Sequence, residues 1–437
     1  MTPYKINHTQ ESFIDPRLSN QLNPKNELYL LSQKIDWSYF EKEFNKIYYP
    51  GQGQPPKPVR LMIGLLILQQ MFNCSDENVV ERWVENGYWQ FFCGYDYLQW
   101  ELPIHPSSLV RFRKRVKKEG VEKILKYSVQ LAIETKTIDK KSIEKTIVDT
   151  TVMPKNITYP SDSKLYEKGC ELLVKEAEKH DISLRQNYNR VRKESIFKYF
   201  QFLRSRKIQK ANKERKKMKT YLGRIFRDVK RKIAGNQSLE NEFDPLLQKI
   251  NRLLHQQKDD KNKLYSLHEP DVCCISKGKM HKKYEFGSKV SIVVTHKEGL
   301  VLSSLSLKGN PFDGHTLNEV LNHAEMITEQ KINSVYVDKG YRGHKITDKQ
   351  VYISGQRNLS SWFKKQLKRR SAIEPHIGHM KNEGKLGRNY LKGMVGDQIN
   401  ALLCGVGHNF KMILRKIILF FNFFLVLIDQ KNVLVSL

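Results

Sequence analysis

Residues 145–152 read KTIVDTTV, a short apolar stretch rich in β-branched side chains, which predicts a β-strand with Asp149 inside it. Comparable stretches return only after residue 283. They predict three further strands, at Tyr284–Thr295, Leu300–Leu307 and Ile332–Val337. Helices are predicted over Leu317–Ile327, from Ser371 onward and from about Asp397 onward. We therefore expect an α/β fold whose strand core is split into a short first piece (145–155) and a longer second piece (283–437).

The segment that splits the strands, residues 156–282, has a different character. Between Arg185 and Lys232 the chain carries 19 Lys and Arg against three acids, which is more than half of the surplus positive charge of the whole chain. Apolar residues recur here at helical spacing: Met218, Tyr221, Leu222, Ile225, Phe226, Val229 and Ile233. This pattern predicts a long basic helical insertion after the first strand.

The whole chain of 437 residues carries a formal net charge of +30. A surplus of that size repels itself unless a polyanion, such as nucleic acid or an acidic membrane, neutralises it. Its 39% hydrophobic content excludes a wholly disordered chain. The six cysteines are scattered, the N-terminus lacks an apolar signal core, and the apolar run Ile417–Ile428 is shorter than the roughly 20 residues of a spanning helix. We expect a cytoplasmic protein that binds DNA or RNA and no membrane.

Residues 1–135 are predicted to be helical. A buried helix begins at Val59, and Asp76–Tyr95 carries one apolar helical face. The segment 105–120, HPSSLVRFRKRVKKEG, predicts a helix capped by Ser107 or Ser108 that stops at Gly120. This helix would display the cations Arg111, Arg113, Lys114, Arg115, Lys117 and Lys118. Two interpretations remain open, a DNA-docking module of helix-turn-helix type and an ordinary bundle with a solvated basic face.

Three acids occupy positions that a strand-and-helix core could bring together. Asp149 lies in the first strand, Asp338 at the end of a later strand, and Glu374 at the start of the helix SAIEPHIGHMKN. Carboxylates that lie close together repel each other and need cations between them. Hard oxygen ligands select Mg²⁺ or Mn²⁺, and two such ions about 3.5–4 Å apart suit in-line attack on phosphodiesters.

The cations around Glu374 favour a site that holds both metal and backbone phosphate. Arg370 precedes Glu374 by four residues, and Lys381 follows by seven, so both lie near its face on a helix. Lys385 and Arg388 would share that face if the helix continued through Gly384 and Gly387. We therefore predict DNA-binding roles for these four cations.

Each acid also has an ordinary structural explanation. Asp149 could be satisfied by nearby backbone or threonines, Asp338 could be a turn residue, and Glu374 could form a capping box with Ser371. His376 and His379 beside Glu374 suggest zinc, but their spacing is not that of a familiar zinc site.

Three separated blocks give the chain a resemblance to the DDE transposases of bacterial insertion sequences, of the IS-five-type group. TIVDTTVMPKNITYPSDSKL (146–165) resembles the first-aspartate motif of that family, and YVDKGYRGH (336–344) the second. RRSAIEPHIGHMKNEGKLGRNYLKGMVGDQINALLCGVGHNF (369–410) resembles the glutamate block. The helical stretch from about 59 to 118 resembles the N-terminal domain of the family.

The resemblance implies an RNase H-like catalytic fold, a mixed sheet flanked by helices, in which Asp149, Asp338 and Glu374 form the metal-binding triad. In related transposases the glutamate helix bears a tyrosine, an arginine, the glutamate and a lysine at fixed spacing. Arg370, Glu374 and Lys381 match this signature, whereas Leu367 stands at the tyrosine position and Trp362 is a nearby candidate substitute.

These observations lead to one functional prediction with two alternatives. We expect a transposase that cuts the ends of an insertion sequence and joins the 3′-hydroxyl ends to target DNA, using two Mg²⁺ or Mn²⁺ ions. The expected partners are double-stranded DNA, at terminal inverted repeats and target, and a second copy in a homodimer in the bacterial nucleoid. The alternatives are a non-catalytic DNA-binding regulator or decayed transposase, and a simple RNase H-like nuclease.

The expected domains follow the same scheme. Residues 1–135 form a helical DNA-binding domain, and residues 140–437 form the catalytic domain, interrupted by the insertion 156–282. We predict that the insertion contacts the DNA backbone, the alternatives being a dimerisation helix and a solvated face.

Overall fold

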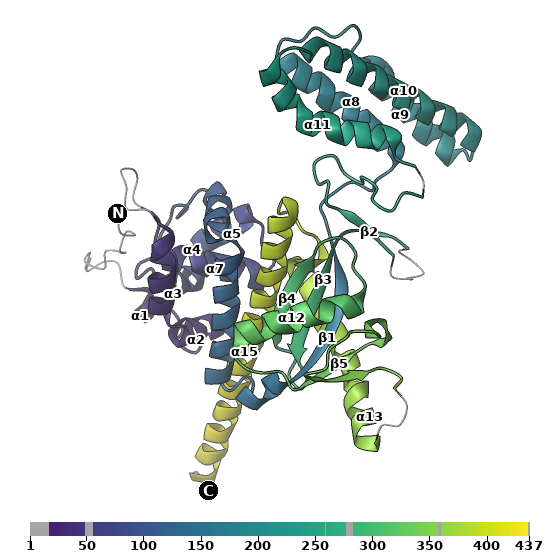
Figure 1. The fold of residues 1–437 in the computed structure, drawn as a ribbon. Helices are drawn as coiled ribbons and strands as arrows, with labels where there is room; N and C mark the ends of the chain where they lie inside the picture. Colours follow the sequence, from purple (N-terminus) through teal and green to yellow (C-terminus); the bar gives the residue numbers. More distant parts are fainter. Residues whose placement is uncertain (1–16, 49–55, 258, 277–282, 357–359, 436–437) are drawn as a thin grey trace. The chain divides into compact units, whose positions relative to one another are not determined.

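The computed structural model describes the chain except residues 1–16, 49–55, 258, 277–282, 357–359 and 436–437, and no side chain beyond residue 419. The chain divides into two compact units (Figure 1). The first comprises residues up to Met153 together with Lys289 onward, and the second comprises Pro154–Ser288. Each unit has its own apolar core and is described separately below.

The N-terminal part of the first unit is helical, as predicted. Its helices are α1 (Leu18–Gln21), α2 (Glu27–Lys34), α3 (Trp37–Phe44), α4 (Val59–Met71), α5 (Asp76–Glu85), α6 (Gly87–Phe92) and α7 (Ser107–Glu134). Helix α4 begins at Val59, as expected, and is buried along almost its whole length. The single apolar helix expected over 76–95 is wrong, because Asn86 ends α5 and caps α6, accepting hydrogen bonds from the backbone of Tyr88 and Trp89.

Helix α7 differs from the expectation at both ends. Ser107 is its first residue, and the preceding Pro106 contributes no side-chain cap. The helix does not stop at Gly120 but continues to Glu134, with a break at Lys117, whose φ of 55° and ψ of −165° are not helical. Gly120 is instead a packing position, since a Cβ there would lie 2.5 Å from Cγ1 of Val116. The glycine therefore permits close packing and does not end the helix.

One six-stranded sheet contains all the predicted strands. Its strands are β1 (Lys145–Pro154), β2 (Cys273–Ile275), β3 (Glu285–Thr295), β4 (Val301–Leu307), β5 (Ser334–Val337) and β6 (Gln350–Ile353). The order is β2-β3-β1-β5-β6, and β4 pairs with β3. β5 is parallel to β1 and β6 to β5, whereas β2 and β4 are antiparallel to β3. The sheet is therefore mixed; β2 and β6 were not predicted.

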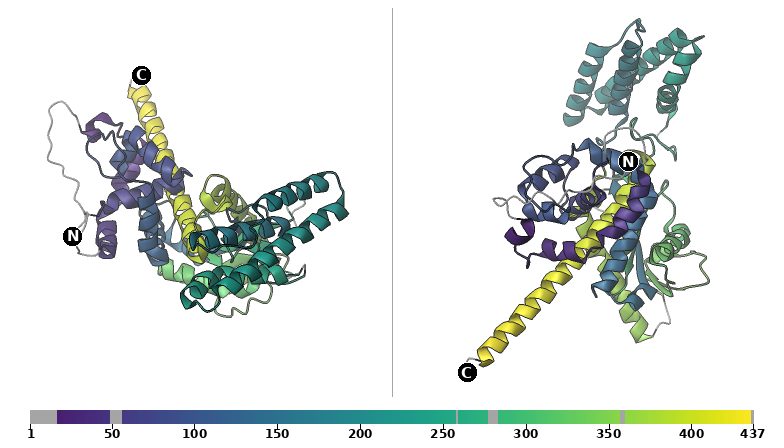
Figure 2. Two further views of the ribbon diagram at one scale, coloured as in Figure 1. Left: turned by 90° about the horizontal axis from the view of Figure 1, so that it is seen from above. Right: turned by 90° about the vertical axis from the view of Figure 1, so that its left-hand side faces the viewer.

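Helices cover both faces of this sheet. On one face, α12 (Asp313–Thr328) and α15 (Gly393–Val435) pack against β4 and α7, and α15 also contacts α4. Figure 2 shows α15, in yellow, as one long helix beside the purple and blue N-terminal helices. On the other face, Ile373 and Ile377 of α14 (Ile373–Asn382) join a cluster with Ile147 and Tyr336 of the sheet. The N-terminal helices and the sheet share one apolar core. Within the part of the chain that the structure describes, no helix has the length and apolarity to cross a membrane.

The second unit contains the predicted basic helices: α8 (Asp162–Lys179), α9 (Asn189–Arg204), α10 (Ile208–Ile233) and α11 (Gln237–His255). The predicted apolar stripe of α10 is confirmed. Met218, Leu222, Ile225, Val229 and Ile233 are buried in the core of this unit, and Tyr221 and Phe226 pack against it. Most of the lysines and arginines of α10 are exposed, so the surplus charge lies on the solvent side of a packed helix.

Candidate active site

Two of the predicted acids belong to neighbouring strands: Asp149 lies in β1, and Asp338 directly follows β5. β1 and β5 pair in parallel, and Ile147 lies opposite Tyr336 in that register. Continued for two residues past this pair, the register would place Asp149 opposite Asp338, which is the first residue after β5. Neighbouring strands lie about 4.8 Å apart. The sheet therefore brings together two acids that are far apart in sequence.

The third acid is linked to the first by an arginine. Glu374 lies in the first turn of α14, and Arg370 lies one turn earlier in the 3-10 segment Arg369–Ala372. One guanidinium nitrogen of Arg370 lies 3.9 Å from Oδ2 of Asp149, and another lies 3.6 Å from Oε1 of Glu374. The side chain of Glu374 is 65% exposed, whereas those of Arg370 and Asp149 are 17% and 19% exposed. Arg370 thus supplies the positive charge between two carboxylates.

Local hydrogen bonds hold the two aspartates. Asp149 accepts a hydrogen bond at Oδ1 from the backbone of Thr150, at 2.7 Å. Asp338 accepts one at Oδ1 from the backbone of Gly340, at 2.8 Å, and so caps the turn Lys339–Tyr341. The turn role considered for Asp338 is therefore present. It engages one oxygen of the carboxylate and is compatible with a role in metal binding.

The capping box considered for Glu374 is absent. The hydroxyl of Ser371 donates to the carbonyl oxygen of Lys368, at 3.0 Å, and Ser371 lies in the 3-10 segment before the helix. The alternative role for Glu374 therefore loses its support. Trp362, the candidate substitute for the missing tyrosine, lies on α13 (Ser361–Lys368), half-exposed, with the ammonium of Lys145 5.5 Å from its ring centre.

A fourth acid, which the sequence interpretation missed, completes the group. Asp313 is the first residue of α12. Its Oδ1 accepts a hydrogen bond from the hydroxyl of Thr150 at 2.9 Å and lies 2.6 Å from the ammonium of Lys289. The available signal was the aspartate in the turn GNPFDG, between a predicted strand and a predicted helix.

The charges of three aspartates act on the buried side chain of Tyr341. Its side chain is fully buried, and burial raises the pKa of this phenol well above its usual value. The negative charges of Asp149, Asp313 and Asp338 raise the pKa of Tyr341 further, because each disfavours a second anion nearby.

The triad does not form a compact ligand cage in this conformation. Among the described residues, the set of acidic and histidine side chains whose ligand atoms all lie within 4.8 Å of one another is Glu176, His180 and Glu242 of the second unit. There the ammonium of Lys179 already bonds both glutamates, at 3.1 and 2.8 Å. Among the described residues, His376 and His379 do not belong to any such set, so the zinc hypothesis gains no support.

The three cations predicted after Glu374 do not lie on one helix. Helix α14 ends at Asn382, so the face that would have carried Lys385 and Arg388 is not continued. Lys381 is half-buried on α14. Burial lowers the pKa of Lys385, and the charge of nearby Asp76 opposes that shift. Arg388 is exposed and lies over the ring of Tyr390, at 5.8 Å. Of the four cations, only Lys381 therefore lies on the helix of Glu374, and Arg370 lies in the 3-10 segment before it.

The basic helix α7 displays fewer cations than expected. Arg111, Lys114 and Arg115 are exposed, as predicted. The expectation for Arg113 is wrong, because its side chain is buried and binds both carboxylate oxygens of Asp76, at 2.8 and 2.5 Å. Helical periodicity turns Arg113 toward α5, where a buried cation needs a partner.

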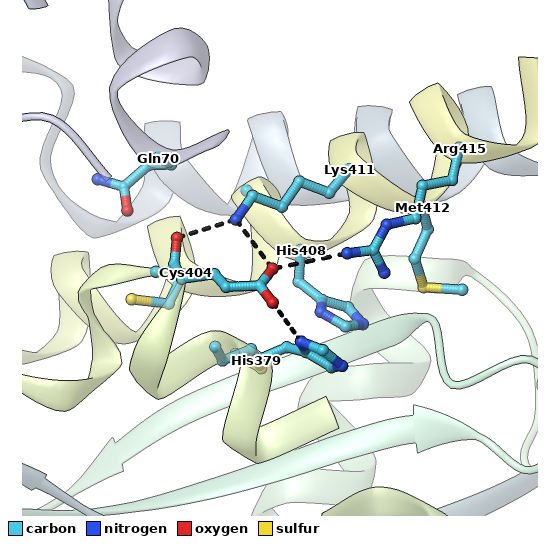
Figure 3. A pocket seen from close by; sticks show the side chains of 11 residues that line it. Gln70, His379, Cys404, His408, Lys411, Met412 and Arg415 are labelled. Atoms are coloured by element: carbon cyan, nitrogen blue, oxygen red, sulfur yellow. Dashed lines mark hydrogen bonds and ion pairs between the residues drawn. The ribbon is translucent and has the colours of Figure 1, made fainter. Parts of the chain in front are cut away.

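A second polar cluster anchors the far end of α14 (Figure 3). The carboxylate of Glu383 lies 2.6 Å from Nδ1 of His379, 3.6 Å from the ammonium of Lys411 and 3.5 Å from the guanidinium of Arg415. Lys411 also donates to the carbonyl oxygen of Glu383, at 2.9 Å. These residues line a small pocket with His408. The cluster ties the helix that carries Glu374 to α15.

His408, which lines the same pocket, makes the stability of the folded chain depend on pH in the acidic range. Burial and, to a smaller extent, the nearby His376 together lower the pKa of His408 to about 3. The unfolded chain would protonate His408 below about pH 6.5, whereas the folded chain keeps it neutral down to about pH 3. Within that window the unfolded state binds more protons, so stability falls as pH falls.

We expect His408→Gln to reduce this loss. Its amide can still donate to the carbonyl oxygen of Gly299, which His408 Nε2 approaches at 3.2 Å. The slope of unfolding free energy against pH should fall by about 1.4 kcal/mol per pH unit between pH 6 and 4. Urea unfolding across this range would measure the slope, with His255→Gln, an exposed histidine of α11, as the control. An unchanged slope in His408→Gln would contradict the assignment.

Together these features define a mixed α/β protein with a helical N-terminal region and a group of acids around one end of its sheet. Residues 16–115 match the family model described as Transposase domain (DUF772), and residues 254–410 match the one described as Transposase DDE domain. The second match includes Asp338 and Glu374, whereas Asp149 lies outside both. The chain is also 42% identical over 208 residues to the uncharacterized protein ORF8 in the nfe locus of Rhizobium meliloti, which covers 48% of this chain and all of that protein. No solved structure matches.

The chain belongs to the DDE transposases of insertion sequences. It is therefore an enzyme that acts on DNA, of a family that uses divalent metal ions.

Proposed function

We propose that this transposase cuts DNA at the ends of an insertion sequence and joins the freed 3′-hydroxyl ends to target DNA. The observation that carries the proposal is the parallel pairing of β1 with β5, whose continued register would place Asp149 opposite Asp338, together with the link through Arg370 from Asp149 to Glu374. The first two blocks of the resemblance thus meet in space with the third. The order of those blocks also supports membership of the IS-five-type group.

The donor set fits the metal that the family implies. Asp149, Asp338 and Glu374 offer carboxylate oxygens only, which are the ligands that Mg²⁺ and Mn²⁺ prefer. When bound, two such ions would supply an activated water and stabilise the leaving oxygen. These three residues would hold them. The 65% exposure of the Glu374 side chain leaves this carboxylate accessible from solvent.

The cations of the site would hold the DNA. Arg370 lies between Asp149 and Glu374, and its planar guanidinium also suits a phosphate. Lys381, two turns further along α14, would hold the backbone beside it. The exposed cations Arg111, Lys114 and Arg115 of α7 would contribute a grip on the terminal repeats that does not depend on sequence.

The domain scheme proposed from the sequence fits this assignment. Residues 1–135 would recognise the ends, residues 140–437 would form an RNase H-like catalytic domain, and 156–282 would interrupt it as a DNA-binding insertion. The central pairing of β1 with β5, and the strand order around it, support the catalytic fold. We further propose that two copies act together on paired ends in the bacterial nucleoid.

A strand-transfer assay separates this function from its rivals. Pre-cut terminal repeats with free 3′-hydroxyl ends are incubated with the full chain, a target plasmid and Mg²⁺. A transposase produces joined product, whereas a simple RNase H-like nuclease only degrades the DNA. A regulator or decayed transposase binds the repeats and produces neither, even with Mn²⁺. The absence of joined product from an active preparation that binds the repeats would contradict the proposal.

A further inference from the structure

The buried Lys289 and the partly exposed Asp313 form an ion pair beside the proposed catalytic acids. Lys289 lies on β3 with its side chain 8% exposed, and its ammonium lies 2.6 Å from Oδ1 of Asp313. The same ammonium donates to the carbonyl oxygen of Pro311, at 2.7 Å. A buried charge is retained only where it is paired and hydrogen-bonded, so this lysine depends on Asp313.

Asp313 also contacts the chain on both sides of the acidic pair. Through Oδ1 it accepts a hydrogen bond from the hydroxyl of Thr150, whose backbone N–H binds Asp149. Its Oδ2 faces the turn that Asp338 caps: a Cβ at Gly340 would lie 3.1 Å from that atom and 3.0 Å from Oδ1 of Asp338. The two carboxylates therefore face each other across a glycine, with no room for a side chain between them.

The geometry points to Asp313 as a positioning residue for divalent-cation binding by Asp149 and Asp338. Its carboxylate neutralises Lys289 and, through Thr150 and the Gly340 turn, holds the two acids toward each other. Without that negative charge, the buried ammonium of Lys289 would face the acidic pair uncompensated and would compete with the metal ion. This inference rests on the proposed function, because it assumes that these two acids bind the metal.

The test measures cation binding directly, in the full chain without DNA. Mn²⁺ is titrated and the free ion is followed by electron paramagnetic resonance. Asp313→Asn keeps the size of the side chain and an acceptor for Thr150 but removes the charge. We expect its Mn²⁺ affinity to fall by about 10–100-fold, the usual effect of losing a residue that supports a metal ligand.

A second substitution distinguishes positioning from direct ligation. In Asp313→Asn/Lys289→Met the uncompensated charge is removed as well, so Mn²⁺ affinity should recover most of its loss. If Asp313 were itself a metal ligand, the double variant would stay as weak as the single one, and the positioning role would be overturned. The double variant also keeps the test valid if the single variant unfolds, because it contains no unpaired buried charge.

Controls separate this inference from a general loss of stability and from the function itself. Glu269→Gln breaks a comparably buried pair in the second unit, where Glu269 lies 3.1 Å from the ammonium of Lys155, and should leave Mn²⁺ affinity unchanged. Normal binding by Asp313→Asn, with wild-type binding that is lost in Asp338→Asn, would overturn the inference and leave the proposed function standing. No Mn²⁺ binding by the wild type would overturn both.

Discussion

Replacing Asp149 by alanine is expected to abolish cleavage at the ends of the element, with a loss of at least about a thousandfold in rate. Metal-ion catalysis supplies several kcal/mol of transition-state stabilisation, and each 1.4 kcal/mol corresponds to a tenfold change in rate. Asp338→Ala and Glu374→Ala should have the same effect, because the three carboxylates would act as one ligand set. Cleavage of a labelled terminal repeat in Mg²⁺ would measure the loss.

The same variants should still bind the terminal repeats, since the cations of α7 and the second unit are unchanged. Binding measured by gel shift therefore serves as the internal control for folding. Asp348→Ala provides a matched control, because this aspartate lies ten residues after Asp338 and its side chain is 67% exposed. A triad variant that still cuts with Mg²⁺ would show that the assignment of that residue is wrong.

Neutralising the solvent face of α10 should weaken the salt dependence of DNA binding. Lys213, Lys216 and Arg227 are exposed, and helical periodicity places them opposite the buried stripe that contains Leu222 and Val229. If each binds a phosphate, changing all three to glutamine should reduce the slope of log affinity against log salt by about 2.7, at about 0.9 per contact. Fluorescence anisotropy with a terminal repeat between 50 and 200 mM salt (roughly the range over which such contacts dominate) would measure it.

The matched control removes the same charge from another helix. Lys168, Lys175 and Lys179 are exposed on α8, and their replacement by glutamine changes the net charge of the protein equally. If the effect were one of net charge alone, both triple variants would flatten the slope to the same extent. An unchanged slope in the α10 variant would favour a dimerisation helix or a solvated face, which sedimentation of the two proteins would then distinguish.

Several local features could be predicted from the sequence because they depend on neighbours along the chain. The strand at 145–152 and the helix beginning at Val59 follow from β-branched and apolar composition, and the stripe of α10 follows from its period. Short or exposed elements were missed. β6 has four residues, none of them fully buried, and α13 has no buried residue, so neither leaves a strong apolar pattern in the sequence.

The sequence predictions were wrong or incomplete at residues whose role is decided by a partner from another element. Arg113 has the same composition around it as the exposed Arg111, yet it faces Asp76 of α5. Asn86 lies within the apolar pattern of residues 76–95, yet the helix is interrupted there, because the side chain of Asn86 caps the next helix. Asp313 lies between a predicted strand and a predicted helix, and no local signal showed that Thr150 and Lys289 would both reach it.

The amino-acid sequence alone therefore determined the kinds of element, the surplus of positive charge in the insertion and the identity of three acids in the blocks that resemble the family. Only the tertiary structure decided which groups meet: the strand of Asp149 pairs with the strand that leads into Asp338, Arg370 links Glu374 with Asp149, and Asp313 pairs with Lys289. The physical reason is one of range. Helical and strand patterns repeat over a few residues, whereas the partner of a buried charge is chosen by strand pairing and packing between segments far apart in the chain.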